Sequence, residues 1–450
     1  MIVLIAQGNG DEQSYFVYGA ISTEIKRYWK AVMMENTSTQ RKLQHGVYYG
    51  WVILLTISFT EITSWGILYY AFTVFLKPMQ AELGWSTAQL TGAFSLALLC
   101  SAGAALPVGS LLDRHGTRWL MTIGSCAASL LLLAWAMVGN LILFYVIWAG
   151  IGIVMATVLY DPAFALVAVW FHKLRARALT ILTFIAGFAS VIFIPLAQWL
   201  IQLLGWRMAL LALALLLALL TIPLHALILR RRPEDLGLVP DGIASPAAMS
   251  LAQSTHEQSI PTKDALHGAT FWWIALAFAL STLTAGAITV HLIPYLIDEG
   301  YPASFAASMA GLIGIMALPG RLVFTLLGER LSRHLVIAIL FLLQVVSLVA
   351  ILLVPTVVGV LCFVVLFGAG FGAIAPARAA VVADHYGSTH YARINSVLGL
   401  FITGARAIAP GGAGIMYDFL GTYPPIFWAL AGSSILATGA ILLVAQSGEK

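Results

Sequence analysis

The chain has 450 residues, of which 60% are hydrophobic and only 9% are charged. Soluble domains carry about 25% charged residues, so this composition excludes an ordinary soluble protein and indicates a polytopic membrane protein. The net charge of +4 follows from where a membrane topology places its positive residues, and no nucleic-acid partner is expected. The cysteines Cys100, Cys126 and Cys362 all lie in apolar runs, which excludes a disulfide framework and a metal site built from them.

Residues 1–45 are expected to form a cytoplasmic extension that is either amphipathic or disordered. The opening run Met1–Ala6 is too short for the apolar core of a signal peptide, and no clear cleavage site follows it. Met33 or Met34 is expected as an alternative start, since the residues after them resemble an ordinary polar tail.

The rest of the chain is predicted to be all-α, with twelve transmembrane helices, because only a helix satisfies its own backbone in lipid and each span needs about 20 apolar residues. The first six are expected at 48–76, 86–111, 118–138, 141–170, 176–203 and 206–229. The second six are expected at 269–297, 303–328, 334–354, 356–383, 392–419 and 423–446.

The predicted domains follow from these spans. An N-terminal six-helix bundle covers 46–229 and a C-terminal six-helix bundle covers 269–446. Between them, residues 230–268 are rich in Ser, Pro, Ala and Gln and are predicted to be a cytoplasmic linker. Residues 447–450 are expected to be a cytoplasmic tail.

The distribution of positive charge predicts the orientation. Of the 23 Lys and Arg residues, 18 fall on one side if the N-terminus is inside. Only Lys77 and Arg207 fall on the opposite side. This asymmetry predicts that both termini are cytoplasmic, and the expected location is a bacterial inner membrane.

A charged island lies between the second and third expected helices and reads Gly109-Ser-Leu-Leu-Asp113-Arg114-His115-Gly116-Thr117-Arg118. Its glycines permit a tight turn, and Asp113 can pair with a nearby Arg or with helix N-terminal amides. The pattern G-x-L-x-D-R-x-G-x-R resembles the loop between helices 2 and 3 of the major facilitator superfamily. The resemblance implies a conformational latch rather than a substrate site; an ordinary basic loop is the alternative.

The two halves of the chain are weakly repeated. Arg177 and Pro195 of the fifth helix are matched by Arg393 and Pro410 of the eleventh at nearly the same spacing. Two pseudo-symmetric bundles with a site near the midplane suit alternating access.

Ionisable residues inside spans are costly and are treated as functional candidates. They occur in the expected helices 1, 4, 7, 8, 10 and 11: Glu61, Asp161, His291, Arg321, Arg378 and Arg406. The third, ninth and twelfth helices have none in their interiors, and the sixth has only His225 near its end. In the facilitator fold that the loop resembles, the first helix of each three-helix unit lines the cavity, which fits this distribution.

Each of these residues also has a structural interpretation. Glu61 could be a protonated packing residue, and Asp161, beside the helix-breaking Pro162, could bridge to an Arg of the fifth or tenth helix. His291 could be solvated, and Arg378 could snorkel or gate near the cytoplasmic end. Arg321 could simply bond carbonyls at a helix end, and Arg406 could have a purely structural role.

Aromatic side chains in the first helix form a further candidate. Trp65, Tyr69 and Tyr70 have helical spacing and could line the outer cavity, or could simply pack.

A second resemblance begins at the end of the fourth helix. Tyr160-Asp161-Pro162-Ala163-Phe164 is followed by Trp170-Phe171-His172-Lys173-Leu174-Arg175-Ala176-Arg177-Ala178. This is similar to the signature of the monocarboxylate transporters and their bacterial relatives, which include the oxalate:formate exchangers. The general resemblance covers about 46–446.

The resemblance implies a binding role for two arginines. In monocarboxylate transporters a helix-8 arginine binds the substrate carboxylate, and a degraded copy of the loop motif, with Glu329 in place of the aspartate, puts Arg321 there. The partner acid of the animal members is missing, since position 317 is Ala317. Oxalate:formate exchangers carry a second cation on helix 11, the helix that holds Arg406.

The sequence therefore favours a secondary transporter of a small organic anion, with Arg321, Arg406, Tyr69, Tyr70 and His291 binding substrate. Asp161, and next Glu61, are the candidates for proton coupling, because a carboxyl whose neighbours change between two conformations binds a proton in one and releases it in the other. The chain is expected to work as a monomer without cofactor or metal.

This prediction has three alternatives. An exporter of hydrophobic drugs or metabolites is the main alternative, and a wide aromatic cavity with Glu61 would favour it. A membrane sensor with a degenerate transporter fold is disfavoured, because no signalling domain is recognised. An enzyme is disfavoured, because the sequence shows no paired carboxylates, nucleophile elbow or metal cluster in a span.

Overall fold

The structure is a computed structural model that describes residues 48–242, 262–328, 330–386 and 391–447. The expected extension 1–45, the middle of the linker, Glu329 and residues 448–450 lie outside the described residues. The chain divides into two units, Met1–Trp51 and Val52–Lys450. This division does not fall at the linker, so the predicted domain boundaries stay predictions.

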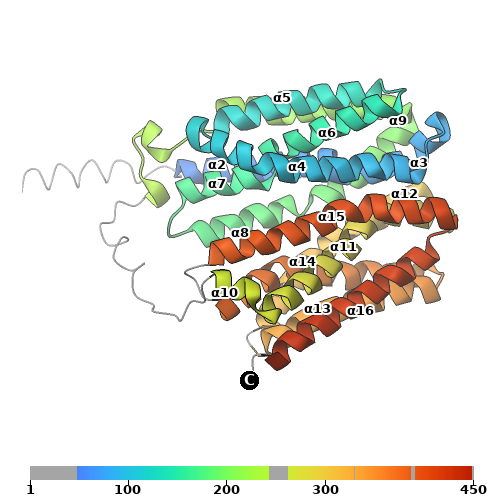
Figure 1. Cartoon of the computed structure of the whole chain (residues 1–450). Coiled ribbons are helices and arrows are strands. Elements are labelled where there is room, and N and C mark those ends of the chain that lie inside the picture. The colour runs from blue at the N-terminus through green and yellow to red at the C-terminus, as the bar shows by residue number, and fades with distance from the viewer. Residues whose placement is uncertain (1–47, 243–261, 329, 387–390, 448–450) are drawn as a thin grey trace, which may run out of the picture. The chain divides into compact units, whose positions relative to one another are not determined.

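The first half comprises the described elements up to residue 242 and is blue to yellow-green in Figure 1. Its helices are α2 (Tyr49–Trp65), α3 (Phe72–Leu83), α4 (Thr87–His115), α5 (Thr117–Ala136), α6 (Leu141–Val158), α7 (Tyr160–Trp170), α8 (Arg175–Ala186) and α9 (Ala189–Leu227). A π-helical turn, η2 (Gly66–Tyr70), joins α2 to α3, and two short 3₁₀ helices follow α9: η3 (Pro233–Leu236) and η4 (Pro240–Gly242).

The second half begins after the linker and is yellow to red in Figure 1. Its helices are α10 (Thr262–His267), α11 (Ala269–Asp298), α12 (Ala303–Leu327), α13 (Arg333–Leu353), α14 (Val357–Tyr386), α15 (Tyr391–Leu420) and α16 (Pro424–Ser447). No strand occurs among the described residues.

Eleven helical stretches within the described ranges are long and apolar enough to cross a membrane. One of them, Arg175–Leu227, has 53 residues. A straight helix of that length would reach roughly 80 Å, against a bilayer core of about 30 Å. Gly205 interrupts it inside α9 with φ 76° and ψ 163°, a conformation that favours glycine. The stretch therefore holds two spans, and the prediction of an all-α membrane protein with twelve spans is confirmed.

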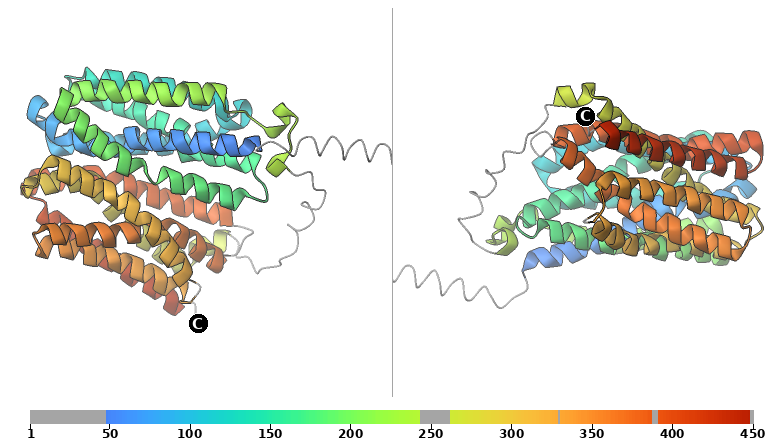
Figure 2. Two further views of the ribbon diagram at one scale, coloured as in Figure 1. Left: turned by 180° about the vertical axis from the view of Figure 1, so that it is seen from behind. Right: turned by 90° about the horizontal axis from the view of Figure 1, so that it is seen from below.

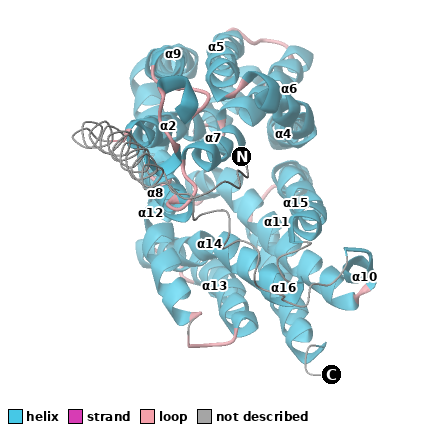
Figure 3. Cartoon of the chain, turned by 90° about the vertical axis from the view of Figure 1, so that its left-hand side faces the viewer, coloured by secondary structure: helices cyan, strands magenta, loops and turns pink. Residues whose placement is uncertain are grey.

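The helices α3–α9 lie together on one side of α11–α16, as Figures 1 and 2 show from opposite directions. Figure 3 looks along the helices and shows the same two groups. Among the described residues, three helix pairs pack extensively across the two halves: α4 on α15, α9 on α12, and α3 on α11. Segments that are far apart in the sequence therefore form the boundary between the halves.

The core of the first half is rich in stacked aromatic rings. Phe72 of α3 and Phe94 of α4 are stacked with centroids 4.6 Å apart, and Trp135 of α5 meets Trp148 of α6 at 4.8 Å. All four side chains are buried. Since lipid tails are as apolar as these rings, close packing rather than exclusion from water holds them in a membrane interior.

The start of the linker folds back onto the first half. The carboxylate of Asp241 accepts hydrogen bonds from the backbone amides of His172, Lys173 and Leu174, the last at 3.2 Å, just before α8. The indole of Trp170 donates to the carbonyl of Arg230 at 3.3 Å. Asp241 has a φ of 60°, which a non-glycine residue rarely adopts. These bonds fasten the chain as far as residue 241 to the loop between α7 and α8.

Candidate functional site

The centre of the first half carries a buried acid in α2. Glu61 is completely buried, and no hydrogen bond of standard geometry reaches its carboxyl oxygens from the described residues. The Trp65 indole, one turn further on, is the polar group that interacts with it most strongly, and Asp161 of α7 is also within electrostatic range. A buried polar group of this kind calls for an explanation other than simple packing.

The π-helical turn determines where the tyrosines of the first helix point. The amide of Ala71 donates to the carbonyl of Gly66, five residues back, at 2.8 Å. The ring of Phe193 on α9 packs against Gly66 so closely that a Cβ there would lie 2.2 Å from a ring carbon. Such π turns are frequent at functional sites, and this one carries Tyr69 and Tyr70.

An aromatic cluster surrounds this turn. The ring of Trp65 lies 5.2 Å from Tyr69, 6.2 Å from Tyr70 and 5.0 Å from Tyr160, centroid to centroid. Tyr160 in turn stacks on Phe164 at 4.9 Å. Tyr160 was not among the predicted site residues; its position next to Asp161 in the quoted motif was the signal that could have identified it.

Asp161 lies in the first turn of α7, next to a helix break. Leu159 has φ −94° and ψ −159°, so α6 ends at Val158 and α7 starts afresh at Tyr160. The predicted break near Pro162 is therefore present, three residues earlier than the proline. Asp161 is exposed, and no ion pair with an Arg is present among the described residues.

Arg321 projects from α12 toward two neighbouring helices. Its Nε donates to the carbonyl of Gly372 on α14 at 3.1 Å, and its Nη1 donates to Oγ1 of Thr183 on α8 at 3.4 Å. Gly372 packs tightly on α12, since a Cβ there would lie 2.0 Å from the carbonyl oxygen of Ala317. The arginine therefore bonds a carbonyl of an adjacent helix and a hydroxyl of the other half.

Arg406 lies on α15, and its side chain is exposed. Its backbone packs against α11 at Gly286, where a Cβ would lie 3.4 Å from the Arg406 carbonyl oxygen. The hydroxyl of Tyr70, from the first half, is within electrostatic range of both Arg406 and Arg321.

A cavity lies between the halves, and Tyr70 contributes to its wall. Its volume is about 40 Å³. The other lining residues come from α9, α11, α12 and α14: Ser190, Ile194, Ile288, Thr289, Leu292, Ala310, Ile313, Gly314, Phe367 and Phe371. Most of the wall is apolar, with hydroxyls from Tyr70, Ser190 and Thr289.

His291 and Arg378 lie apart from this cavity wall. His291 is completely buried rather than solvated, with Nε2 2.9 Å from the carbonyl of Pro410 and Nδ1 3.3 Å from the Tyr423 hydroxyl. Both ring nitrogens already have partners within the second half. Arg378 lies on α14 beyond Pro376 and is half-buried.

The predicted latch residues lie where α4 meets α5. Gly116 alone connects the two helices, with φ 78°, and the side chain of Arg231 packs over it. Arg118 donates from Nε to the carbonyl of Ala226 at the end of α9, at 2.8 Å. Arg114 is exposed, and the side chain of Asp113 lies outside the described part of the structure.

Gly109 departs from the expectation that both glycines of this motif serve the tight turn, because it lies inside α4. Nothing lies within 4 Å of a Cβ built at Gly109. The tight turn therefore depends on Gly116.

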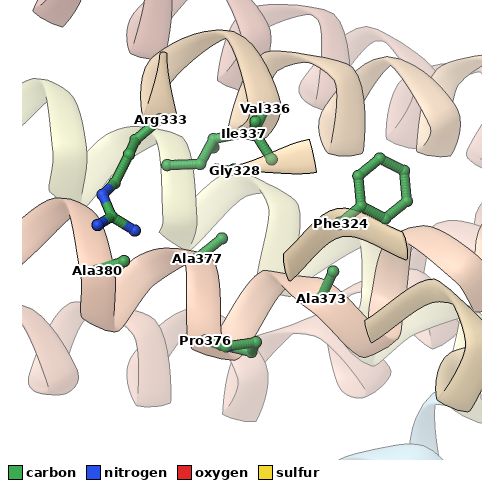
Figure 4. A pocket seen from close by; sticks show the side chains of 9 residues that line it. All are labelled: Phe324, Gly328, Arg333, Val336, Ile337, Ala373, Pro376, Ala377 and Ala380. Carbon is green, nitrogen blue, oxygen red and sulfur yellow. The ribbon is translucent and has the colours of Figure 1, made fainter. Parts of the chain in front are cut away.

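A second cavity lies within the second half, between α12, α13 and α14 (Figure 4). Its volume is about 220 Å³, and it is lined by Phe324, Gly328, Arg333, Val336, Ile337, Ala373, Pro376, Ala377 and Ala380. Figure 4 shows the side chain of Arg333 extending from α13 toward Ala380. Arg333 is paired with Asp384, and none of the predicted site residues lines this cavity.

The described residues contain no group of three or more His, Cys, Asp or Glu side chains that could hold a metal ion. The side chains that line the central cavity offer the hydroxyls of Tyr70, Ser190 and Thr289 and the rings of Phe367 and Phe371. Arg321 and Arg406 lie outside this lining, and their guanidinium groups are of the kind that binds an anion through paired hydrogen bonds.

Twelve spans, two helix groups and a cavity between them define a polytopic membrane transporter. The chain matches the model of the Major Facilitator Superfamily over residues 54–374, and it belongs to that family.

Two of the relatives that the chain resembles are named as monocarboxylate transporters. The chain is 26% identical to monocarboxylate transporter 12-B of Danio rerio, with 78% of this chain and 79% of the relative covered. It is also 26% identical to monocarboxylate transporter 13 of Rattus norvegicus, with 88% of each chain covered.

A solved structure supports the fold. The bacterial homologue of the human lysosomal transporter Spinster, in its inward-facing and occupied conformation, matches with a TM-score of 0.68 at 16% identity. The match covers 89% of this chain and 98% of that one.

Proposed function

We propose that this transporter carries a small organic anion, most specifically a monocarboxylate, by alternating access. The observation that carries the proposal is the position of Arg321, whose guanidinium group bonds the Gly372 carbonyl of the second half and the Thr183 hydroxyl of the first half. The names of the curated relatives support the same substrate class. An anion bound at this point would contact both halves, as a substrate that is passed from one side to the other must.

Arginine suits this task better than lysine would. A guanidinium group presents two parallel donors to a carboxylate, whereas an ammonium group acts as a point charge. Arg321 is already oriented by the Gly372 carbonyl and the Thr183 hydroxyl, so less conformational entropy is lost when it binds an anion.

Proton coupling is part of the proposal and assigns Asp161 as the carrier, with Glu61 next. Asp161 is exposed beside the break at Leu159, where water can reach it, and Glu61 is fully buried within its electrostatic range. Approach of an arginine to Asp161 in another conformation would release its proton. The cycle would then be a symport of proton and anion across a bacterial inner membrane, by a monomer with cytoplasmic termini.

Export of hydrophobic drugs or metabolites is the second candidate. The aromatic cluster around Trp65 and the mostly apolar cavity wall favour it. A hydrophobic cation or neutral drug would not need the two arginines, and this difference separates the candidates.

Thermal stabilisation of the purified protein by a panel of organic acids tests the proposal, because a ligand of the folded state raises the unfolding temperature. We expect small monocarboxylates to stabilise the wild type and to lose that effect in Arg321→Ala and Arg406→Ala. Arg330→Ala, which removes an exposed cation elsewhere on the chain, is the matched control. Stabilisation by hydrophobic drugs that persists in both of these variants would favour the exporter instead.

A further inference from the structure

One carboxylate at the end of α11 joins the two halves of the molecule. Asp298 forms an ion pair with Lys77 of α3, and it accepts a hydrogen bond from the Tyr417 hydroxyl of α15 at 2.8 Å. The ammonium group of Lys77 also lies 5.7 Å from the centroid of the Tyr417 ring. Lys77 belongs to the first half, whereas Asp298 and Tyr417 belong to the second.

A second carboxylate binds the beginning of α4. Asp418, the neighbour of Tyr417, accepts hydrogen bonds from the amides of Thr87 at 3.1 Å and Ala88 at 3.0 Å. These amides are the first two of α4 and have no partner inside their own helix. The positive end of the helix dipole adds to the attraction for a carboxylate. Asp418 thus caps a helix of the other half.

Glycines of α15 allow the backbones to approach below this cap. A Cβ at Gly414 would lie 2.2 Å from the hydroxyl oxygen of Thr91, and the amide of Gly411 donates to the Ser95 hydroxyl at 2.8 Å. On α3, the Thr73 hydroxyl donates to the carbonyl of Val290 on α11 at 2.7 Å. Together these contacts form a continuous seam between the halves at the end opposite the linker.

The linker end of the same boundary is packed differently. Neither α7 nor α8, which approach the linker end of the first half, packs extensively on a helix of the second half among the described residues. The Arg321–Thr183 hydrogen bond, at 3.4 Å, is a polar contact across the boundary at that end. The halves are therefore held together mainly at the end that the charge distribution predicts to face outside.

We propose that Asp298 and Asp418 form a gate that closes the end opposite the linker and must be released when that end opens. The inference goes beyond the proposed function, because it concerns which side of the carrier is accessible and not what the carrier binds. Asp298 and Asp418 both belong to the second half, whereas their partners, Lys77 and the first amides of α4, belong to the first half. Separation of the halves therefore breaks both contacts at once.

The energetic argument rests on charge-assisted hydrogen bonds. Such bonds stabilise by more than neutral ones, and together they bias the balance between the two conformations roughly ten-fold or more toward closure at this end. Lys77 and Asp298 are partly buried, which limits screening by salt. Replacing the carboxylates by amides keeps their size and removes the charge.

The test measures the distance across the gate in the full chain. Spin labels at Gly139→Cys, between α5 and α6, and Thr356→Cys, between α13 and α14, report the separation of the halves at this end, with Cys100, Cys126 and Cys362 replaced by Ser. Both labelled positions are exposed, and nothing lies within 4 Å of a Cβ at Gly139. The label-to-label distances are compared in the wild type, in Asp298→Asn, in Asp418→Asn and in the double variant.

Glu82→Gln is the matched control. Glu82 lies at the same end and pairs with Arg207 and Trp206, but all three residues belong to the first half. The exchange Lys77→Asp with Asp298→Lys serves as the rescue, because it restores the ion pair with reversed polarity.

We expect the ratio of long to short distances to rise about ten-fold in the double variant and less in each single one. The ratio should stay at the wild-type value in Glu82→Gln, and in the exchange variant it should be closer to the wild-type value than in Asp298→Asn. A double variant with the wild-type distribution, or a Glu82→Gln variant that opens equally, would overturn the gate. Substrate binding measured on the same samples separates this outcome from failure of the proposed function.

Discussion

The guanidinium group of Arg321 reaches across the boundary between the halves and donates to the hydroxyl of Thr183 at 3.4 Å. The same side chain is held by the carbonyl of Gly372 within its own half. An arginine with one partner in each half changes its surroundings whenever the halves move. This position links the binding of an anion to the conformational change that transport requires.

Substitution of this arginine should separate folding from transport. Arg321→Lys keeps the charge but loses the bidentate geometry, so we expect an intact fold and a loss of most transport, on the order of ten-fold or more. Thr183→Ala removes only one weak hydrogen bond and should cost much less. Uptake in reconstituted vesicles measures both, and wild-type uptake by Arg321→Ala would contradict the binding role.

The loop between α4 and α5 should influence the balance of conformations from the linker end. Asp113, Arg114 and Arg118 are predicted to hold that side closed when the opposite side is open, so Asp113→Asn should shift the population toward the state that is open at the linker end. Labelling of single cysteines on that side measures the shift. Equal accessibility in variant and wild type would argue against a latch at this loop.

Asp161 should decide whether transport is driven by a proton gradient. We expect Asp161→Asn to abolish uphill accumulation in response to outside acidification and to leave counterflow exchange of labelled substrate intact, because exchange needs no net proton movement. Glu61→Gln, compared in the same assay, identifies the carrier. Uphill accumulation by Asp161→Asn would assign the proton to Glu61 or indicate an exchanger without protons.

His291 should contribute to stability more than to binding. Replacing it by Ala leaves the Pro410 carbonyl and the Tyr423 hydroxyl without their partner in a buried site, which should cost about 2 kcal/mol of unfolding free energy. Thermal unfolding in detergent measures this loss. His172→Ala, at an exposed position, is the control, and an equal loss in both variants would remove the distinction.

The spans could be predicted from the sequence because apolar length is a local property. The eleventh expected helix, 392–419, agrees with α15 (Tyr391–Leu420), and Gly205 separates the fifth and sixth spans where the sequence analysis placed the boundary. The sequence predicted the helix break at Leu159 only indirectly, through the nearby Pro162. The π turn at Gly66 was missed, because it depends on the ring of Phe193 from a distant helix.

The candidate site residues could be selected from the sequence because ionisable side chains are rare inside membrane spans. Glu61 and Asp161 lie within electrostatic range of each other, and so do Tyr70 and the two arginines Arg321 and Arg406. The binding and coupling roles of these residues stay predictions. His291 was equally rare in its span, but its partners on α15 and α16 occupy both ring nitrogens. No local pattern reveals partners more than 100 residues away.

The contacts of the proposed gate were missed for the same reason. Lys77 was recognised only as one of two positive residues on the outer side, and its partner Asp298 is 221 residues away in the sequence. The scarcity of positive charge on that side was the available signal.

The anchoring of Asp241 has a mechanical consequence for the connection between the halves. The carboxylate of Asp241 is hydrogen-bonded to the backbone amides before α8. The stretch from Arg230 to Asp241 therefore moves together with the first half and does not lengthen the connection between the halves. Any movement of the second half is accommodated only by the chain beyond this anchor. Residues deleted or inserted after Asp241 would therefore change the reach of the tether, whereas the same change before it would instead pull on the α7–α8 loop.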